Sequence, residues 1–224
     1  MNNVAVLASM RPRWCKLVAS EKKGADLRKN FPTMFFQRHL NNTEHKVGDA
    51  FKPFKVYMYC TKSKYEIDSL YAYRKYPSGV ELRTRNIYGD DIYGKYCNGK
   101  VIGEFVCNRI EDLSQWKYDL PALYRHIKLH ACVDYDELNE YIQGNEGYLW
   151  YISDVTIYDE PMDLNEFRIF CEGNGTEQDK RCVNCPHLLF DNDPISGYTR
   201  WCELSKLKPL SRPPQSWCYV LEIP

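Results

Sequence analysis

The 224-residue sequence lacks any long hydrophobic run. Its apolar segments are short, and one of the clearest, Val4 to Met10, is far below the roughly 20 apolar residues that a membrane helix needs. The residues around it, Met-Asn-Asn before and Arg-Pro-Arg-Trp after, do not match the basic start and the cleavage site of a signal peptide. We therefore expect a cytoplasmic location and no membrane partner.

Several motifs that identify common enzyme classes are also missing. The chain has no glycine-rich phosphate loop, no serine-hydrolase elbow and no dinucleotide-binding fingerprint. Its five histidines show no catalytic arrangement. His126 and His130, four residues apart in a predicted helix, are expected to lie on an ordinary helix face rather than to share a metal.

The absence of net charge conceals a strong asymmetry along the chain. Residues 1–85 hold 17 basic and 7 acidic residues, whereas residues 86–170 hold 7 and 16. A basic first third is suited to binding phosphates, because each neutralised phosphate releases counterions. The alternative is that this basic part docks on the acidic middle of the same chain.

The pattern of apolar residues predicts strands separated by a few helices. Strands are expected at 4–10, 25–29, 54–60, 100–107, 147–157 and 216–223, and helices from Pro12, over 120–130 and after the N-cap Asp134. Within the second strand, Asp26 and Arg28 should point to the same side, because side chains alternate along a strand. These elements predict an α+β fold.

Residues 61–98 form an insertion that is rich in tyrosine and basic residues and is longer than an ordinary hairpin connection. We expect it to have some structure of its own. Its tyrosines, including Tyr73 and Tyr76, could stack on exposed bases while its Arg and Lys side chains follow phosphates. The alternative is a hairpin whose tyrosines cover the barrel or a partner subunit.

Motifs in a characteristic order resemble the signature of ASCH domains, which belong to the PUA-like superfamily and are often carried by phages and prophages. The matching segments are Ser9-Met10-Arg11-Pro12, Lys23-Gly24-Ala25-Asp26-Leu27-Arg28, Val56 to Thr61, Gly99 to Phe105, Tyr148 to Ile152 with Tyr158 to Pro161, and Arg212 to Trp217. The resemblance implies a PUA-like β-barrel, which we expect, with flanking helices, over residues 1–167. The loop-rich and Cys-containing residues that follow are expected to form an insertion over 168–210, and residues 211–224 to return as a final barrel strand.

The resemblance also implies a basic cleft that holds RNA, a nucleotide or a modified nucleobase. The residues expected to bind this ligand are Ser9, Arg11, Arg13, Lys23, Asp26, Arg28, Lys29, Gln215 and Trp217. Their cationic groups could grip phosphate, with Arg able to bind it in bidentate fashion, or they could form an ordinary salt-bridged surface. A phage-encoded protein of this kind could sequester a nucleotide that serves as a host defence signal.

Some ASCH relatives remove the acetyl group of N4-acetylcytidine with a Lys, a Thr and an Arg on this strand. Lys23 and Arg28 match two of them, but the Thr position holds Asp26, and residues 21–32 contain no Ser or Thr. A carboxylate is a poor nucleophile toward an amide, so we expect binding rather than turnover. If the chain is an enzyme, Lys23, Asp26 and Glu104 are the candidate acid and base groups. A protein-protein interaction module is a further alternative.

The ten cysteines are expected to be reduced in the cytoplasm. Cys182 and Cys185 form a two-residue knuckle, and with Cys171 and Cys202 they could hold a structural zinc ion. His187 could replace one of these cysteines, and free thiols or a catalytic role are the alternatives. Cys60, Cys107 and Cys218 fall on predicted strands and are expected to be core residues. The oligomeric state and the identity of the ligand stay open.

Overall fold

The computed structural model describes residues 4–35, 52–74, 79–84, 94–116, 118–143, 147–170, 188–193, 197–202 and 209–223. Its strands are β1 (Val4–Met10), β2 (Ala25–Arg28), β3 (Phe54–Cys60), β4 (Leu70–Arg74), β5 (Val80–Thr84), β6 (Lys95–Tyr96), β7 (Lys100–Asp112), β8 (Tyr148–Met162), β9 (Leu188–Asp193), β10 (Gly197–Cys202) and β11 (Trp217–Leu221). Its α-helices are α1 (Pro12–Ala19), α2 (Leu120–Ala131) and α3 (Tyr135–Ile142), and the short 3-10 turns are η1 (Thr33–Phe35), η2 (Glu66–Asp68), η4 (Leu113–Trp116) and η5 (Leu164–Glu166).

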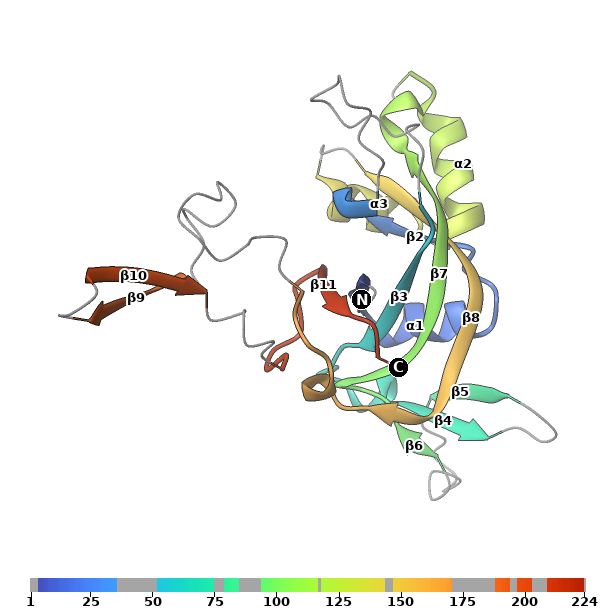
Figure 1. The fold of residues 1–224 in the computed structure, drawn as a ribbon. Helices are drawn as coiled ribbons and strands as arrows, with labels where there is room; N and C mark the ends of the chain where they lie inside the picture. The colour runs from blue at the N-terminus through green and yellow to red at the C-terminus, as the bar shows by residue number, and fades with distance from the viewer. Residues whose placement is uncertain are drawn as a thin grey trace.

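Six strands form a mixed and strongly curved sheet at the centre of the molecule (Figure 1). Their order is β11-β1-β3-β7-β8-β2, in which β1 and β3 run parallel and the other neighbours run antiparallel. β7 and β8 have 13 and 15 residues, and their pairing contains three register shifts. Such bulges increase the bend and twist of a strand, which accounts for the curvature of the sheet.

Gly103 lies at the first of these shifts, where β7 and β8 approach each other closely. A Cβ atom at this position would lie 2.3 Å from the backbone oxygen of Thr156. Because real Cβ atoms do not come so near to other atoms, any other residue here would force the two strands apart. The tight approach of β7 to β8 thus depends on this glycine.

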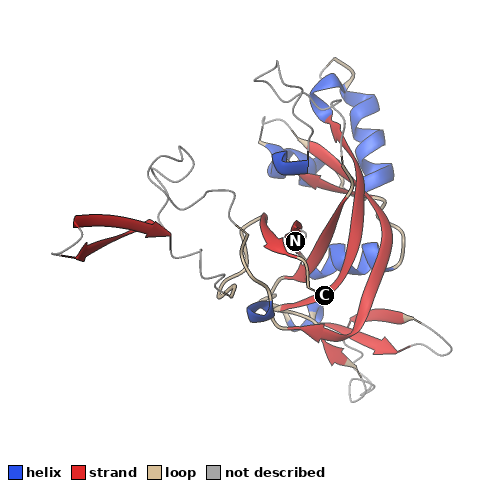
Figure 2. Ribbon diagram, viewed as in Figure 1, coloured by secondary structure: helices blue, strands red, loops and turns tan. Residues whose placement is uncertain are grey.

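Side chains join the two edge strands of the sheet, β2 and β11. Arg28 at the end of β2 donates from Nη1 to the backbone oxygen of Ser216, just before β11, at 2.9 Å. Its Nη2 donates to the backbone oxygen of Ser9 at 3.1 Å, and the Trp217 indole Nε1 donates to Asn30 Oδ1 at 2.7 Å. The sheet is therefore a half-barrel (Figure 2). These side-chain hydrogen bonds bridge its open side.

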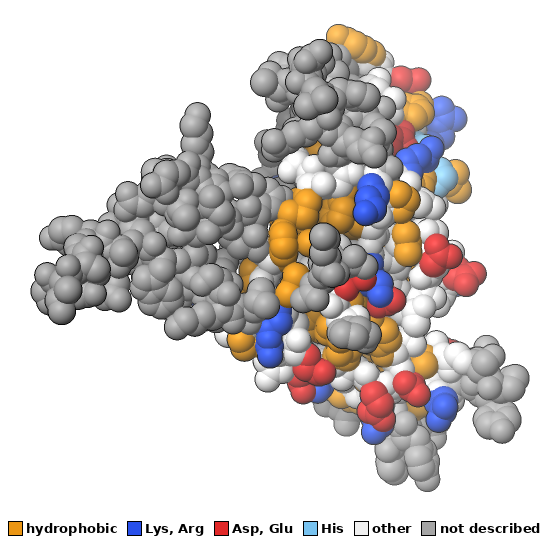
Figure 3. Space-filling view, in the orientation of Figure 1, with side chains coloured by type: hydrophobic (Ala, Val, Ile, Leu, Met, Phe, Trp, Pro, Cys, Tyr) orange, Lys and Arg blue, Asp and Glu red, His pale blue; other side chains and the backbone are white. Residues whose placement is uncertain are grey.

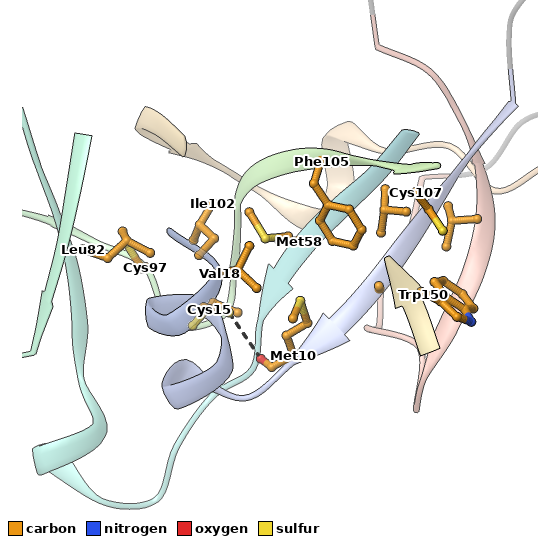
Figure 4. Packing of buried hydrophobic residues seen from close by; sticks show 14 of the residues in the cluster. Met10, Cys15, Val18, Met58, Leu82, Cys97, Ile102, Phe105, Cys107 and Trp150 are labelled. Carbon is orange, nitrogen blue, oxygen red and sulfur yellow. Dashed lines mark hydrogen bonds between the residues drawn. The ribbon is translucent and has the colours of Figure 1, made fainter. Parts of the chain in front are cut away.

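Apolar side chains pack on both faces of the curved sheet. The largest cluster includes Met58, Phe105 and Trp150 and packs against Val18 of α1 (Figure 4). Leu82 of β5 belongs to the same cluster, so the insertion shares the core of the half-barrel. Figure 3 shows hydrophobic side chains in the middle of the face seen in Figure 1, with charged side chains of both signs between and around them.

Two smaller clusters complete the core. One surrounds Tyr57 and Phe167, whose rings meet edge to face at 4.9 Å between centroids. The other packs α2 and α3 against β2 and β8, and it includes Leu27, Ile127 and Leu138. Both ends of the half-barrel are therefore covered, one by the segment after β8 and the other by helices.

Local sequence sets where the helices begin. α1 begins at Pro12, whose missing N–H group is not needed in a first helical turn. Asp119 caps α2 by accepting from the backbone N of Ala122, and Asp134 and Glu137 form the predicted capping box of α3. Among the described residues, no helix has the length and apolar character that crossing a membrane requires.

The insertion forms a separate three-stranded sheet of order β5-β4-β6, which confirms that it has structure of its own. Buried Asn98, just before β7, ties the start of this sheet in place. Its Oδ1 accepts from Leu70 N at 2.8 Å and its Nδ2 donates to the backbone oxygen of Asp68 at 3.2 Å. The turn that carries Asp68 is thereby held against the half-barrel.

The predicted α+β class with flanking helices is confirmed, and β1 and β3 have the predicted bounds. β7 extends five residues beyond its predicted end, because its second half continues to pair with β8 as far as Asp112 and Tyr148. β8 continues through Pro161, which lies close to its end. Most of the predicted Cys-rich insertion at 168–210 lies outside the described residues, apart from the β9-β10 hairpin and a few flanking residues.

Candidate functional site

Three predicted site residues, Lys23, Asp26 and Arg28, form a buried charged cluster. Asp26 Oδ2 accepts from Arg28 Nε at 2.6 Å, and Asp26 Oδ1 lies 3.5 Å from Lys23 Nζ. The Lys23 ammonium also donates to the backbone oxygen of Ala131 at 2.7 Å and lies 4.7 Å from the centre of the Trp14 ring. The three charged residues are only 2%, 5% and 5% exposed. The prediction that Asp26 and Arg28 share one side of the strand is confirmed.

Burial and neighbouring charges shift the pKa values within this cluster. Burial acts to raise the pKa of Asp26, but the charges of Arg28 and Lys23 outweigh it and lower that pKa. Burial lowers the pKa of Lys23, and the Asp26 carboxylate opposes only part of this shift. Asp26 is therefore ionised at neutral pH, as its ion pair with Arg28 requires.

A short segment in front of β11 covers the cluster. Ser9 Oγ donates to the backbone oxygen of Pro214 at 2.7 Å, and Ser9 N donates to the backbone oxygen of Ser216 at 2.8 Å. Arg28 Nη1 also donates to Ser216 Oγ at 3.2 Å. Acceptors within the protein therefore occupy Nε and both terminal nitrogens of the guanidinium, which leaves it little capacity to bind a phosphate.

The other two predicted arginines lie at the start of α1. Arg11 precedes the helix and is exposed. Arg13 is also exposed, donates from Nη1 to Glu137 Oε1 at 2.6 Å, and lies 4.5 Å from the centre of the Trp14 ring. Both guanidinium groups are thus at the surface, in contrast to that of Arg28.

The remaining predicted binding residues flank the buried cluster. Lys29 is exposed, and its Nζ lies 5.3 Å from the centre of the Tyr141 ring. Gln215 is exposed, whereas Trp217 is partly buried against Trp150, at 5.8 Å between ring centroids. The structure thus brings Trp217 and the segment before it to the buried cluster, through Ser216.

Glu104 lies elsewhere. Its carboxylate accepts from the Tyr158 hydroxyl at 2.6 Å and lies 3.1 Å from Lys55 Nζ. Tyr158 packs on the cluster around Tyr57, which is a different cluster from the one that contains Val18 and Trp150. The structure therefore does not bring Glu104 together with Lys23 and Asp26.

A surface hollow of about 420 Å³ lies between α1 and the insertion, which lie side by side in Figure 1. Its lining residues are Pro12, Arg13, Lys16, Leu17, Asp68, Thr84 and Cys132. This volume falls within the range of about 300–1,000 Å³ that is typical of small-molecule sites. One wall, from α1, carries two cations, and the opposite wall, from the insertion, carries a carboxylate and a hydroxyl.

Further cations border this hollow. The backbone N of Thr61 donates to the backbone oxygen of Met10 at 2.8 Å, which holds the loop after β3 beside the start of α1. Lys62 and Lys64 of this loop are exposed, and Tyr65, which follows them, is 71% exposed. A basic loop with an accessible aromatic ring therefore stands next to the hollow.

Three of the residues that line the hollow, Lys16, Asp68 and Thr84, were not predicted from the sequence as site residues. Lys16 lies three residues after Arg13, so helical periodicity places the two on one face and would have found it. Asp68 and Thr84 have no such signal. They meet because β4 and β5 pair with Leu70 opposite Thr84, a register that the sequence of the insertion does not reveal.

Part of the charge asymmetry is used within the molecule. Among the described residues, three ion pairs join residues 1–85 to residues 86–170, and they are Arg13–Glu137, Lys55–Glu104 and Arg74–Asp159. The first and the last of these pairs are exposed, and exposed pairs contribute little stability. Arg11 and Lys16 have no ion-pair partner among the described residues. The contacts between residues 1–85 and 86–170 therefore leave these two cations available in and just before α1.

A second polar cluster, unnoticed in the sequence, lies under α2. Glu111 accepts from the Tyr151 hydroxyl at 2.6 Å, from Trp116 Nε1 at 3.0 Å, and lies 3.1 Å from His126 Nε2. Burial raises the pKa of Glu111, but these hydrogen bonds outweigh it and lower the pKa. The rings of His126 and His130 lie 4.7 Å apart on one helix face. The cluster fixes α2 to the sheet.

The predicted zinc ligands Cys171, Cys182 and Cys185 lie outside the described residues, and only the backbone of Cys202, in β10, is described. In the described part of the chain, no group of three or more His, Cys, Asp or Glu side chains could hold a metal ion. Cys60 and Cys107 are fully buried core residues, as predicted, and Cys218 is partly buried.

No family model and no curated protein matches this chain. Solved structures do resemble it. The crystal structure of the ASCH protein from Zymomonas mobilis has a TM-score of 0.40 and 13% identity, over 72% of this chain and 75% of that chain. A serine-to-alanine mutant of the same protein has a TM-score of 0.41 and 13% identity over the same shares, and a tyrosine-to-phenylalanine mutant has 0.40 and 11% over 90% and 93%. These three structures are all of an ASCH protein, which is the family that the motifs of this chain resemble.

Proposed function

We propose that this chain binds RNA or nucleotides in the hollow between α1 and the insertion. The observation that carries the proposal is the pair of exposed cations, Arg13 and Lys16, in the wall of a hollow of about 420 Å³. Arg11, Lys62 and Lys64 add positive charge around them. Phosphate is the group that such a cationic surface binds best.

The site differs from the cleft that the ASCH resemblance implies. In that cleft Lys23 and Arg28 would face the ligand, but here they are buried, and the groups that could reach a phosphate donate to Asp26, Ser216 and other protein acceptors. Within the described ranges, Arg11 and Lys16 have no such bonds, and Arg13 shares a surface ion pair with Glu137. Tyr65 supplies an accessible ring on which a base could stack.

The proposal is tested by fluorescence anisotropy with labelled single-stranded RNA at several salt concentrations. The double variant Arg11→Glu/Lys16→Glu is expected to bind at least about 10-fold more weakly and to show a shallower salt dependence, because fewer counterions are released. The double variant Arg125→Glu/Arg168→Glu serves as the matched control, since both arginines are exposed cations that do not line the hollow and the change in net charge is the same. Equal affinity of the double variant and the wild type would contradict the proposal.

Hydrolysis of a modified nucleoside is a second candidate function. One observation favours it: Lys23 lies beside Asp26, and burial lowers the lysine pKa, which suits a lysine that acts as a base. A substrate could reach this pair only if the segment around Pro214 and Ser216 moved away. Turnover of N4-acetylcytidine by the wild type, and none by Lys23→Ala, would establish this function, and RNA binding without turnover would exclude it for this substrate.

A further inference from the structure

We propose that the nucleotide taken by the hollow carries guanine. This inference rests on the proposed function and adds the identity of the base to it. Its basis is the chemical difference between the two walls of the hollow, with Arg13 and Lys16 on the α1 wall and Asp68 and Thr84 on the insertion wall. A ligand that fits both walls has an anionic end and, opposite to it, an end that donates hydrogen bonds.

Asp68 is held in position to accept such hydrogen bonds. Its Oδ2 accepts from Ser63 Oγ at 2.7 Å, its backbone N donates to the oxygen of Tyr65 at 3.1 Å, and its backbone oxygen accepts from Asn98 Nδ2 at 3.2 Å. Asn98 is only 4% exposed, so this anchor is part of the core. Within the described part of the chain, Oδ1 of Asp68 has no hydrogen-bond partner, and a carboxylate can accept further bonds on both oxygens.

Among the four RNA bases, guanine is the one that presents two adjacent donors, N1–H and N2–H, on its Watson–Crick edge. Adenine and cytosine each place one amino group beside a ring nitrogen whose lone pair would face the carboxylate. Uracil offers one N–H between two carbonyl oxygens. Because charges of like sign or unpaired acceptors disfavour the wrong partner, a fixed carboxylate selects guanine. Stacking on Tyr65 would add affinity but no selection, since every base has a π-face.

The test is isothermal titration calorimetry of the full chain with GMP, AMP, CMP and UMP. We expect GMP to bind about 10-fold more tightly than the others, as for one bidentate contact to a base. Asp68→Asn should remove this advantage while AMP affinity stays within about twofold, because Asn keeps the shape of Asp68 but loses its charge. Asp136→Asn, at an exposed position of α3, is the matched control and should bind as the wild type does.

The outcomes separate this inference from the proposed function. Equal affinity for all four nucleotides would overturn the guanine assignment and leave nucleotide binding intact. A preference for GMP that survives in Asp68→Asn would also overturn it, because another group would then select the base. If no nucleotide binds and RNA does not bind either, both proposals fail. Circular dichroism of each variant checks that a loss of binding does not come from a loss of fold.

Discussion

Arg28 connects three parts of the chain that are far apart in sequence: β2, the end of β1 and the segment before β11. Its guanidinium bonds to Asp26, Ser9 and Ser216 while it is 5% exposed. Alternation along the strand was sufficient to predict that Asp26 and Arg28 lie on one side. It could not predict that this side is closed, because the cover comes from Pro214 and Ser216, nearly 190 residues later.

Replacement of this arginine should therefore destabilise the fold. We expect Arg28→Met to lower the free energy of unfolding in urea by about 3–5 kcal/mol, because it leaves the buried Asp26 carboxylate with Lys23 alone. Arg28→Lys, which keeps the charge but loses the planar fork, should fall between this variant and the wild type. Arg125→Met, at an exposed position of α2, is the control. An unfolding free energy of Arg28→Met equal to that of the control would show that Arg28 does not close the half-barrel.

The same cluster predicts a pH dependence. The pKa of Asp26 is below its ordinary value of 3.8 in the folded chain, so the unfolded chain takes up the proton first. The resulting stabilisation is complete above pH 3.8 and is lost as the pH falls through the lower, folded pKa. The difference in unfolding free energy between the wild type and Asp26→Asn should be constant at neutral pH and shrink below about pH 4. If the difference in unfolding free energy between the wild type and Asp26→Asn stayed constant from pH 5 to about pH 2.5, the lowered pKa of Asp26 would not be the source of the pH dependence.

At the scale of elements, the regular strands and helices were predictable and the insertion was not. β1 and β3 alternate or run as short apolar segments, and α3 carries its own capping box, so local sequence defines them. The insertion depends on pairing between β4, β5 and β6 and on Asn98, which lies after all three strands. The wall that carries Asp68 and Thr84 could therefore not be predicted.

Asn98 offers a test of how this element shapes the site. We expect Asn98→Ala to cost about 1–3 kcal/mol of unfolding free energy, because Leu70 N loses its buried acceptor. RNA and GMP affinity should fall as well, since the turn that holds Asp68 loses a bond. Urea unfolding and calorimetry measure the two effects. Asn108→Ala, on the exposed side of β7, should change neither. If the Asn98→Ala protein were less stable but bound RNA and GMP as tightly as the wild type does, the turn that carries Asp68 would not contribute to the site.

At the scale of the whole molecule, the charge asymmetry had two interpretations, and both have support. Ion pairs such as Arg13–Glu137 join the basic and acidic thirds, as internal docking predicts. Arg11 and Lys16 nevertheless keep their charge at the surface beside the hollow, as a phosphate-binding surface requires. Sequence counts alone could not divide the cations between these roles, because the division depends on which elements the half-barrel brings together.

The proposed ligand site lies between α1 and the insertion rather than at the buried cluster of Lys23, Asp26 and Arg28. The most direct test is photo-crosslinking of the full chain to single-stranded RNA that contains 4-thiouridine, followed by mass-spectrometric mapping of the attached peptides. The account predicts crosslinks within residues 11–17 and 61–68, with Tyr65 the foremost aromatic acceptor. Crosslinks confined to residues 23–28 and 214–217 would contradict it and return the ligand to the cleft that the family resemblance implies.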